Sequence, residues 1–94
     1  MINKIDISDF TKISTEQSIK HDLIIRFKMR RKESKLTQRA LSIMSGVSYG
    51  SIRRFEVSGD ISLHALLKLS RVLGTIDDFN NIFDKQITTN IKDM

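Results

Sequence analysis

Two adjacent arginines, Arg53 and Arg54, are the residues of this sequence best suited to chemistry. They lie in the stretch SGVSYGSIRRFEVSGD, residues 45–60, among small hydroxyl residues and glycines. An arginine guanidinium can donate two parallel hydrogen bonds to a guanine edge, and Tyr49 can reach a phosphate or a thymine methyl group. This combination indicates a nucleic-acid ligand, provided that other elements present these side chains on one surface.

Hydroxyl groups in the same stretch add a means of binding phosphate. Ser48 and Ser51 lie at the predicted start of a helix, where hydroxyls and free backbone amides can both bind phosphate oxygens. Contacts of this kind position a protein on a duplex without reading its sequence. The serines therefore complement the arginines.

Positive charge is concentrated in the middle of the chain, whose overall net charge is +5. Residues 20–54 hold ten lysines or arginines against two acids, a balance of +8, whereas residues 1–19 sum to −1 and residues 55–94 to −2. One sign of charge concentrated in this way favours a polyanionic partner, and a solvated basic face is the alternative.

Catalytic and metal-binding chemistry are not expected. The chain has no cysteine, and His21 and His64 lie on different predicted helices without an acid at ligand spacing. Asp77 and Asp78 point about 100° apart on a helix, so they suit its first turn better than acid–base catalysis. We expect no enzyme, no metal and no cofactor.

Length and composition favour one small domain in the cytoplasm. Ninety-four residues can bury a modest core. The absence of cysteine suits a reducing compartment. No apolar run approaches the roughly 18 residues of a membrane span, and the start, MINKIDISDF, lacks the pattern of a signal peptide.

The elements that must position the arginines are predicted to be helices. Proline is absent and only four glycines occur, so few residues interrupt a helix. Capping residues and hydrophobic periodicity predict an all-α bundle of five helices, at about 15–32, 38–45, 49–57 and 63–73, with a fifth that begins at Thr75. The expected caps are Ser14 with Gln17, then Thr37, Ser48 and Ser62, and the expected stops are Gly46 and Gly74.

The same periodicity predicts which side chains face the core. The inward residues are Leu23, Ile24 and Phe27, then Ala40, Leu41 and Met44, then Ile52 and Phe55, then Leu63, Leu66, Leu67, Ser70 and Leu73. Phe79, Ile82 and Phe83 form the apolar side of the last helix. We divide the chain into an N-terminal segment (1–14), a DNA-binding domain (15–84) and a C-terminal tail (85–94).

The second and third predicted helices have the spacing of a helix-turn-helix, in which the second helix lies in the DNA major groove. With Ile52 and Phe55 turned inward, Arg53 and Arg54 face outward together with Tyr49. Gly50 is a poor helix former, so its presence makes sense where a backbone approaches another surface. The predicted DNA-binding residues are Thr37, Gln38, Arg39, Ser48, Tyr49, Gly50, Ser51, Arg53 and Arg54.

The string LTQRALSIMSGVSYGSIRRFE resembles the helix-turn-helix of XRE (Cro/CI-type) regulators. The resemblance covers residues 27–83 and implies a lambda-repressor-like DNA-binding domain in a nucleoid-associated protein. It also implies that Gln38 contacts the DNA backbone and that Tyr49, Gly50 and Arg54 read bases. Ser42 stands where the family usually has a buried alanine.

A longer string, RFEVSGDISLHALLKLSRVLGTIDDFNNIF, resembles HipB-type regulators encoded beside HipA-type serine/threonine kinase toxins. That resemblance implies an antitoxin that represses its own operon and joins a toxin complex. Two alternatives remain: a solitary or phage-type XRE repressor, and a three-gene system in which a separate protein neutralises the kinase.

A homodimer is expected because a short helix-turn-helix makes few base contacts. Its interface is predicted at Phe79, Ile82, Phe83 and Ile87, extended by Ile91, although the helical residues of this set could instead close the monomer core. At the two ends, the spacing of Ile2, Ile5, Ile7 and Phe10, and of Ile87, Thr88 and Thr89, fits either short strands or disorder.

Overall fold

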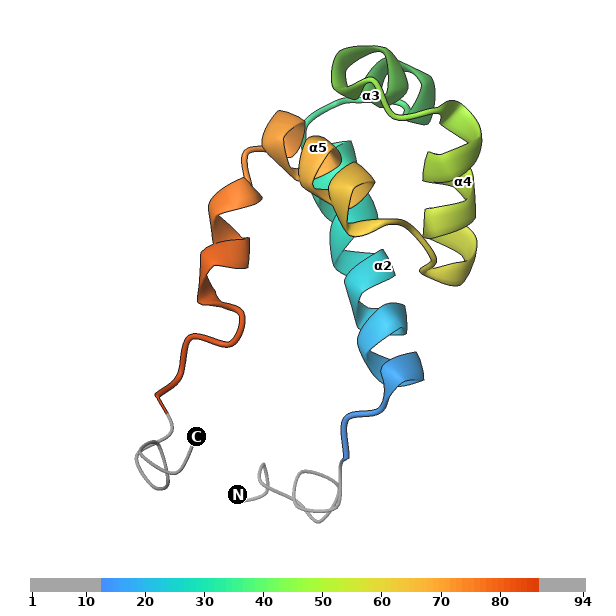
Figure 1. The fold of residues 1–94 in the computed structure, drawn as a ribbon. Helices are drawn as coiled ribbons and strands as arrows, with labels where there is room; N and C mark the ends of the chain where they lie inside the picture. The colour runs from blue at the N-terminus through green and yellow to red at the C-terminus, as the bar shows by residue number, and fades with distance from the viewer. Residues whose placement is uncertain (1–12, 87–94) are drawn as a thin grey trace, which may run out of the picture.

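The computed structural model describes residues 13–86, and in this range the chain forms four α-helices followed by one 3-10 helix (Figure 1). The elements are α2 (Glu16–Glu33), α3 (Gln38–Ser45), α4 (Tyr49–Ser58), α5 (Leu63–Leu73) and η2 (Ile76–Asn81). The predicted all-α class with five helices is confirmed. The segments 1–12 and 87–94, which include Ile87, Ile91 and the possible strands, lie outside the described residues.

Three of the predicted N-caps are confirmed by hydrogen bonds. The hydroxyls of Thr37, Ser48 and Ser62 accept from the amides of Ala40, Ser51 and Ala65 at 3.0, 3.1 and 3.0 Å. Each bond satisfies a backbone donor that the helix itself leaves unpaired. These caps fix where α3, α4 and α5 begin.

The predicted cap of the first helix is wrong by one residue. Thr15 is the N-cap: its hydroxyl accepts from the Ser18 amide at 3.0 Å, and the Ser18 hydroxyl accepts from the Thr15 amide at 2.9 Å. Serine thus takes the place that glutamate or glutamine usually holds in a capping box. A search for the usual pattern selects Ser14 and Gln17 instead.

The core lies where the four α-helices meet. Its fully buried side chains are Leu41, Ile52, Phe55 and Leu69, with Phe27, Val47 and Leu73 nearly so. The Phe27 and Phe55 rings pack edge to face, with centroids 4.9 Å apart and planes at 85°, a favoured aromatic geometry. This contact joins α2 to α4 and so ties the helix-turn-helix to the longest helix.

Two predicted core residues are exposed instead. Met44 and Leu63 expose 60% and 63% of their surface, whereas Leu69, which was not assigned to the core, is fully buried. The leucines of α5 lie on two overlapping faces of the helix, so their spacing alone does not show which of the two faces is buried. Packing of α5 against α3 selects the face that contains Leu69 and Leu73.

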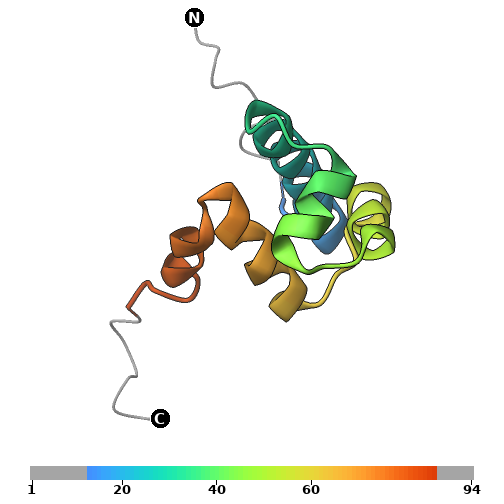
Figure 2. The same ribbon diagram turned by 90° about the horizontal axis from the view of Figure 1, so that it is seen from above.

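The last element differs most from the prediction. It is a short 3-10 helix that ends at Asn81, so Ile82 and Phe83 do not continue a helical stripe begun by Phe79. Figures 1 and 2 show this segment, in orange to red, to one side of the four α-helices and opposite α4. Phe79 is half-buried, whereas Phe83 is fully exposed.

An exposed ion pair connects the start of α2 to the turn after α4. Lys20 donates to Asp60 at 2.8 Å, and through this hydrogen bond and its charge Lys20 holds the pKa of Asp60 below its ordinary value. Because the folded-state pKa is lowered, the stability from this pair is present above the ordinary pKa. It is lost as the pH falls through the lowered value.

Candidate nucleic-acid interface

The turn between α3 and α4 is held by a few local contacts. Gly46 ends α3 in the left-handed conformation, at φ 79°, which glycine adopts without steric cost. Val47 then plugs the core with 5% of its surface exposed. The Ser42 hydroxyl donates to the Val47 carbonyl at 2.6 Å. Ser42, which stands where the family usually has alanine, therefore stabilises the turn through this hydrogen bond.

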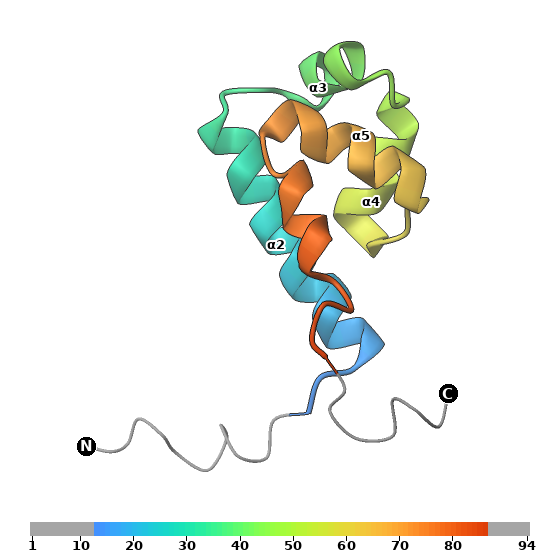
Figure 3. The same cartoon turned by 60° about the vertical axis from the view of Figure 1, so that its left-hand side comes forward.

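The predicted outward face of α4 is confirmed as exposed. Ile52, Phe55 and Glu56 are buried, while Gly50, Arg53 and Arg54 are open to solvent. A shallow hollow of about 330 Å³ runs along this face, lined by Gly50, Arg53, Arg54, Val57 and Ser58. Figure 3 shows α5 in front of α4, and in Figure 1 α4 lies at the right-hand edge of the fold with no described element beyond it.

Tyr49 joins the two arginines nearest to it. The Arg39 guanidinium lies 4.1 Å from the centre of the Tyr49 ring, and the Arg53 guanidinium lies 5.6 Å from it. Both distances are within the range of cation–π attraction. Because Arg39 is on α3 and Arg53 is on α4, the half-buried tyrosine brings charges from both helices to the turn between them.

The hydroxyl groups at the helix starts serve first as caps. Ser48 accepts from the Ser51 amide and donates to the Ser51 hydroxyl at 2.8 Å. Thr37 caps α3 in the same way and is exposed. Their phosphate-binding role stays a prediction, with the capped helix N-termini as its structural basis.

Gln38 is not the freely exposed side chain that the sequence suggested. It is half-buried, and its amide donates to Glu56 Oε1 at 3.0 Å. Glu56 in turn accepts from Arg31 through Nε at 2.7 Å and through Nη2 at 3.0 Å. Arg31 also donates to the Leu36 carbonyl at 2.9 Å. These bonds link the ends of α2 and α3 to α4.

The buried Arg31–Glu56 pair lowers the number of cations in residues 20–54 that can contact DNA. Arg31 and Glu56 expose 8% and 7% of their surface, so the Arg31 charge is compensated inside the protein. Lys20 is paired as well, with Asp60. The buried Arg31 is therefore not available to DNA, whereas the exposed Lys20–Asp60 pair holds its lysine only weakly. The exposed cations nearest the helix-turn-helix are Lys35, Arg39, Arg53 and Arg54.

The family assignment follows from a match over the same elements. A sequence model of the HTH_3 helix-turn-helix family matches residues 27–79, more than half of the 94-residue chain. The chain belongs to this helix-turn-helix family. Members are XRE-type DNA-binding domains with a lambda-repressor-like fold, as the all-α arrangement described above shows for this chain. No curated protein and no solved structure matches the chain significantly.

Membership of the HTH_3 family makes the chain a DNA-binding transcriptional regulator, a class that is typically non-enzymatic. Across the part that the structure describes, no three His, Asp or Glu side chains come together as a metal site would require. Within residues 13–86, no helix combines the length and apolar character needed to cross a membrane.

Two residues of this HTH_3 domain matter more than the sequence suggested. Val57 lies on the outward face of α4, seven residues after Gly50, with 83% of its surface exposed. A spacing of seven residues is about two helical turns, so the sequence could have placed Val57 on the same face of α4 as Gly50. In the sequence Arg31 resembles one more surface cation, and only the structure shows that it forms a buried ion pair with Glu56.

Gly50 offers a test of the interface within this HTH_3 domain. A Cβ built on Gly50 meets no atom within 4 Å, so nothing in the chain itself requires glycine there. We expect Gly50→Ala to leave the fold intact and to raise stability by up to about 1 kcal/mol, because alanine is the better helix former. We also expect it to weaken DNA binding, because the methyl group occupies space that DNA would use.

Thermal melts and DNA titrations of the same Gly50→Ala preparation would check both expectations. Ala65→Gly on α5, away from the interface, is the matched control and should lower stability with unchanged DNA affinity. Equal DNA binding by the Gly50→Ala variant and the wild type would show that the backbone at Gly50 does not approach DNA closely.

Proposed function

We propose that this regulator is a sequence-specific repressor that binds operator DNA as a homodimer, with α4 in the major groove. The observation that carries the proposal is the exposed face of α4, where Arg53 and Arg54 flank the open backbone of Gly50. A helix with arginines on its outer face and its apolar side in the core is what major-groove reading requires.

The contacts divide into two kinds in this proposal. Arg54, Tyr49 and Gly50 face base edges, and Arg53 lies beside them. Phosphate contacts come from the helix starts and from the exposed cation that follows the α3 cap: Thr37, Gln38, Arg39, Ser48 and Ser51. The Gln38 amide donates to Glu56, so its side chain reaches DNA through its carbonyl oxygen and a bridging water, or through the α3 backbone amides.

Arg54→Ala tests whether α4 reads bases. We expect this variant to bind its operator about 1 to 3 kcal/mol more weakly and to lose preference at one base pair per half-site. Competition titrations against single-base operator variants would measure both effects. Arg71→Ala, an exposed arginine in the last turn of α5, is the control and should change neither. A uniform loss of affinity for every sequence would make Arg54 a phosphate contact.

A second copy supplies the second half-site. Two copies related by a two-fold axis can place their recognition helices about 34 Å apart, one turn of the duplex. We place the dimer contact at the C-terminal side of the domain, around Phe79, Ile82 and Phe83, with Ile87 as a further candidate beyond the described residues. Ile82 and Phe83 expose 53% and 100% of their surface.

We further propose that this repressor is the antitoxin of a HipBA-like system and joins a complex with a HipA-like kinase. Support comes from the sequence resemblance that begins at Arg54 and continues through α5 and η2. In this proposal residues 15–84 bind DNA, and residues 1–14 and 85–94 are the candidates for contact with the kinase. Co-purification of the neighbouring gene product from the native operon tests it. Recovery of the repressor alone would favour a solitary regulator.

A further inference from the structure

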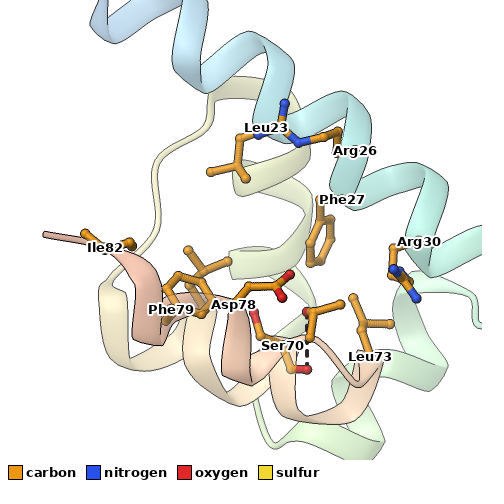
Figure 4. Close-up of a pocket in the computed structure, with 11 residues that line it drawn as sticks. Leu23, Arg26, Phe27, Arg30, Ser70, Leu73, Asp78, Phe79 and Ile82 are labelled. Atoms are coloured by element: carbon orange, nitrogen blue, oxygen red, sulfur yellow. Dashed lines mark hydrogen bonds between the residues drawn. The ribbon is translucent and has the colours of Figure 1, made fainter. Parts of the chain in front are cut away.

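A groove with a volume of about 340 Å³ lies between α2 and the α5–η2 segment. Figure 4 shows Leu23 and Phe27 of α2 on one side of it and Phe79 and Ile82 of the C-terminal segment on the other, with Leu73 at one end. Most of its lining is apolar. Such a concave apolar surface is a place where another side chain can be buried.

Phe83 comes directly after Ile82, the last residue that lines this groove, and its own side chain does not enter the groove. Its side chain is 100% exposed, although phenylalanine ordinarily gains free energy from burial. Its backbone lies at φ 64°, a left-handed conformation that is a genuine outlier for a bulky residue. The chain therefore holds an aromatic side chain in solvent in a sterically unfavourable backbone conformation. Burial of the ring against another apolar surface would gain free energy that offsets this cost.

Charges on the groove and beside Phe83 are complementary. Arg26 and Arg30 line the α2 side of the groove and Asp78 lines its other side, so the lining carries one net positive charge. Neither arginine belongs to the two ion pairs formed within residues 13–86. Asp84 follows Phe83 directly and is exposed. A segment that inserts Phe83 into this groove thus carries an acid toward two available arginines.

We propose that the groove receives Phe83 of a second copy of this chain, while the second copy receives Phe83 of the first. A projecting side chain and a matching groove on the same surface are what a two-fold symmetric contact requires. This inference rests on the proposed dimeric repressor and specifies how its copies join. η2, which borders the groove, and α4 lie on opposite sides of the bundle in Figures 1 and 2, so this contact leaves both recognition helices open to DNA.

Two full-length variants separate the projecting side chain from the groove. Phe83→Ala removes the aromatic ring and keeps the groove. Leu23→Trp keeps Phe83 and fills the groove from a half-buried position on its edge. Each variant should dimerise about a hundredfold or more weakly than the wild type, because two phenylalanine side chains lose their burial. Ile43→Ala, at an 82% exposed site on α3, is the control and should dimerise normally.

The decisive sample is an equal mixture of the two variants. The groove of the Phe83→Ala copy can still receive Phe83 of the Leu23→Trp copy, so one of the two contacts is restored in the mixed dimer. Sedimentation equilibrium should therefore detect mixed dimers at concentrations where each variant alone is monomeric, and circular dichroism should show that both variants are folded.

Three outcomes would overturn the inference. Normal dimerisation of Phe83→Ala would move the contact elsewhere and leave the dimeric repressor standing. Absence of mixed dimers, with both variants folded and monomeric, would exclude the reciprocal insertion. A wild-type chain that is monomeric both in solution and on operator DNA would reject the inference together with the proposed dimer, while DNA binding itself would remain established by titration.

Discussion

Glu56→Gln is expected to lower the free energy of unfolding by about 3 to 5 kcal/mol, because it leaves the buried Arg31 guanidinium without a compensating charge. Arg31 and Glu56 expose only 8% and 7% of their surface, and two hydrogen bonds of 2.7 and 3.0 Å join them. Glu56 also accepts from Gln38. Glutamine has nearly the same shape but replaces one accepting oxygen by a donating NH2 group, so the loss combines the missing charge with at least one broken hydrogen bond.

Urea denaturation followed by circular dichroism would measure this loss. Asp60→Asn is the matched control, since it neutralises the acid of an exposed ion pair, and its effect should be far smaller. A second variant tests the physical reason: replacing both partners, as Arg31→Met with Glu56→Leu, should recover most of the lost stability. Equal small effects of Glu56→Gln and Asp60→Asn would show that water reaches the Arg31–Glu56 pair.

Affinity for operator DNA is expected to fall by about three to five decades between about 50 and 200 mM salt, if a dimer neutralises about 6 to 10 phosphates. Each phosphate neutralised by a cation releases counterions, which makes binding weaker as salt rises. The cations able to contribute are the exposed ones near the helix-turn-helix, because Arg31 is buried against Glu56.

Titrations of operator DNA at several salt concentrations would measure the slope of log affinity against log salt. Arg39→Ala removes one cation from each copy and should reduce this slope by about 2 per dimer. Gln38→Ala removes no charge and should leave the slope nearly unchanged. A nearly flat response of the wild type would contradict an interface dominated by phosphate contacts.

The sequence predicted the elements around the candidate site more closely than the rest of the chain. The bounds of α3 and the starts of α4 and α5 agree with the prediction, because one hydroxyl residue caps each helix and a glycine ends it. Such signals are local, so the sequence is sufficient to find them. The exposure of Arg53 and Arg54 then follows from the inward positions of Ile52 and Phe55.

Features that depend on distant residues could not be predicted in this way. The pairing of Arg31 with Glu56 joins residues 25 positions apart, and a charged residue in a basic run looks like a solvated one. The change from α-helix to 3-10 helix after Gly74, and the exposure of Phe83, depend on how η2 packs against α5. The DNA-contact roles of the α3 and α4 residues remain predictions for the experiments above.

The position of Tyr49 also provides a built-in optical probe. It is the only tyrosine of the chain, which has no tryptophan, and its ring lies between Arg39 and Arg53 on the candidate interface. All intrinsic near-ultraviolet emission from a tyrosine or tryptophan in this protein therefore originates at the turn between α3 and α4. Unlabelled wild-type protein can report whatever disturbs the two flanking guanidinium groups, and fluorescence lifetimes would follow that local event separately from the folding of the remaining domain.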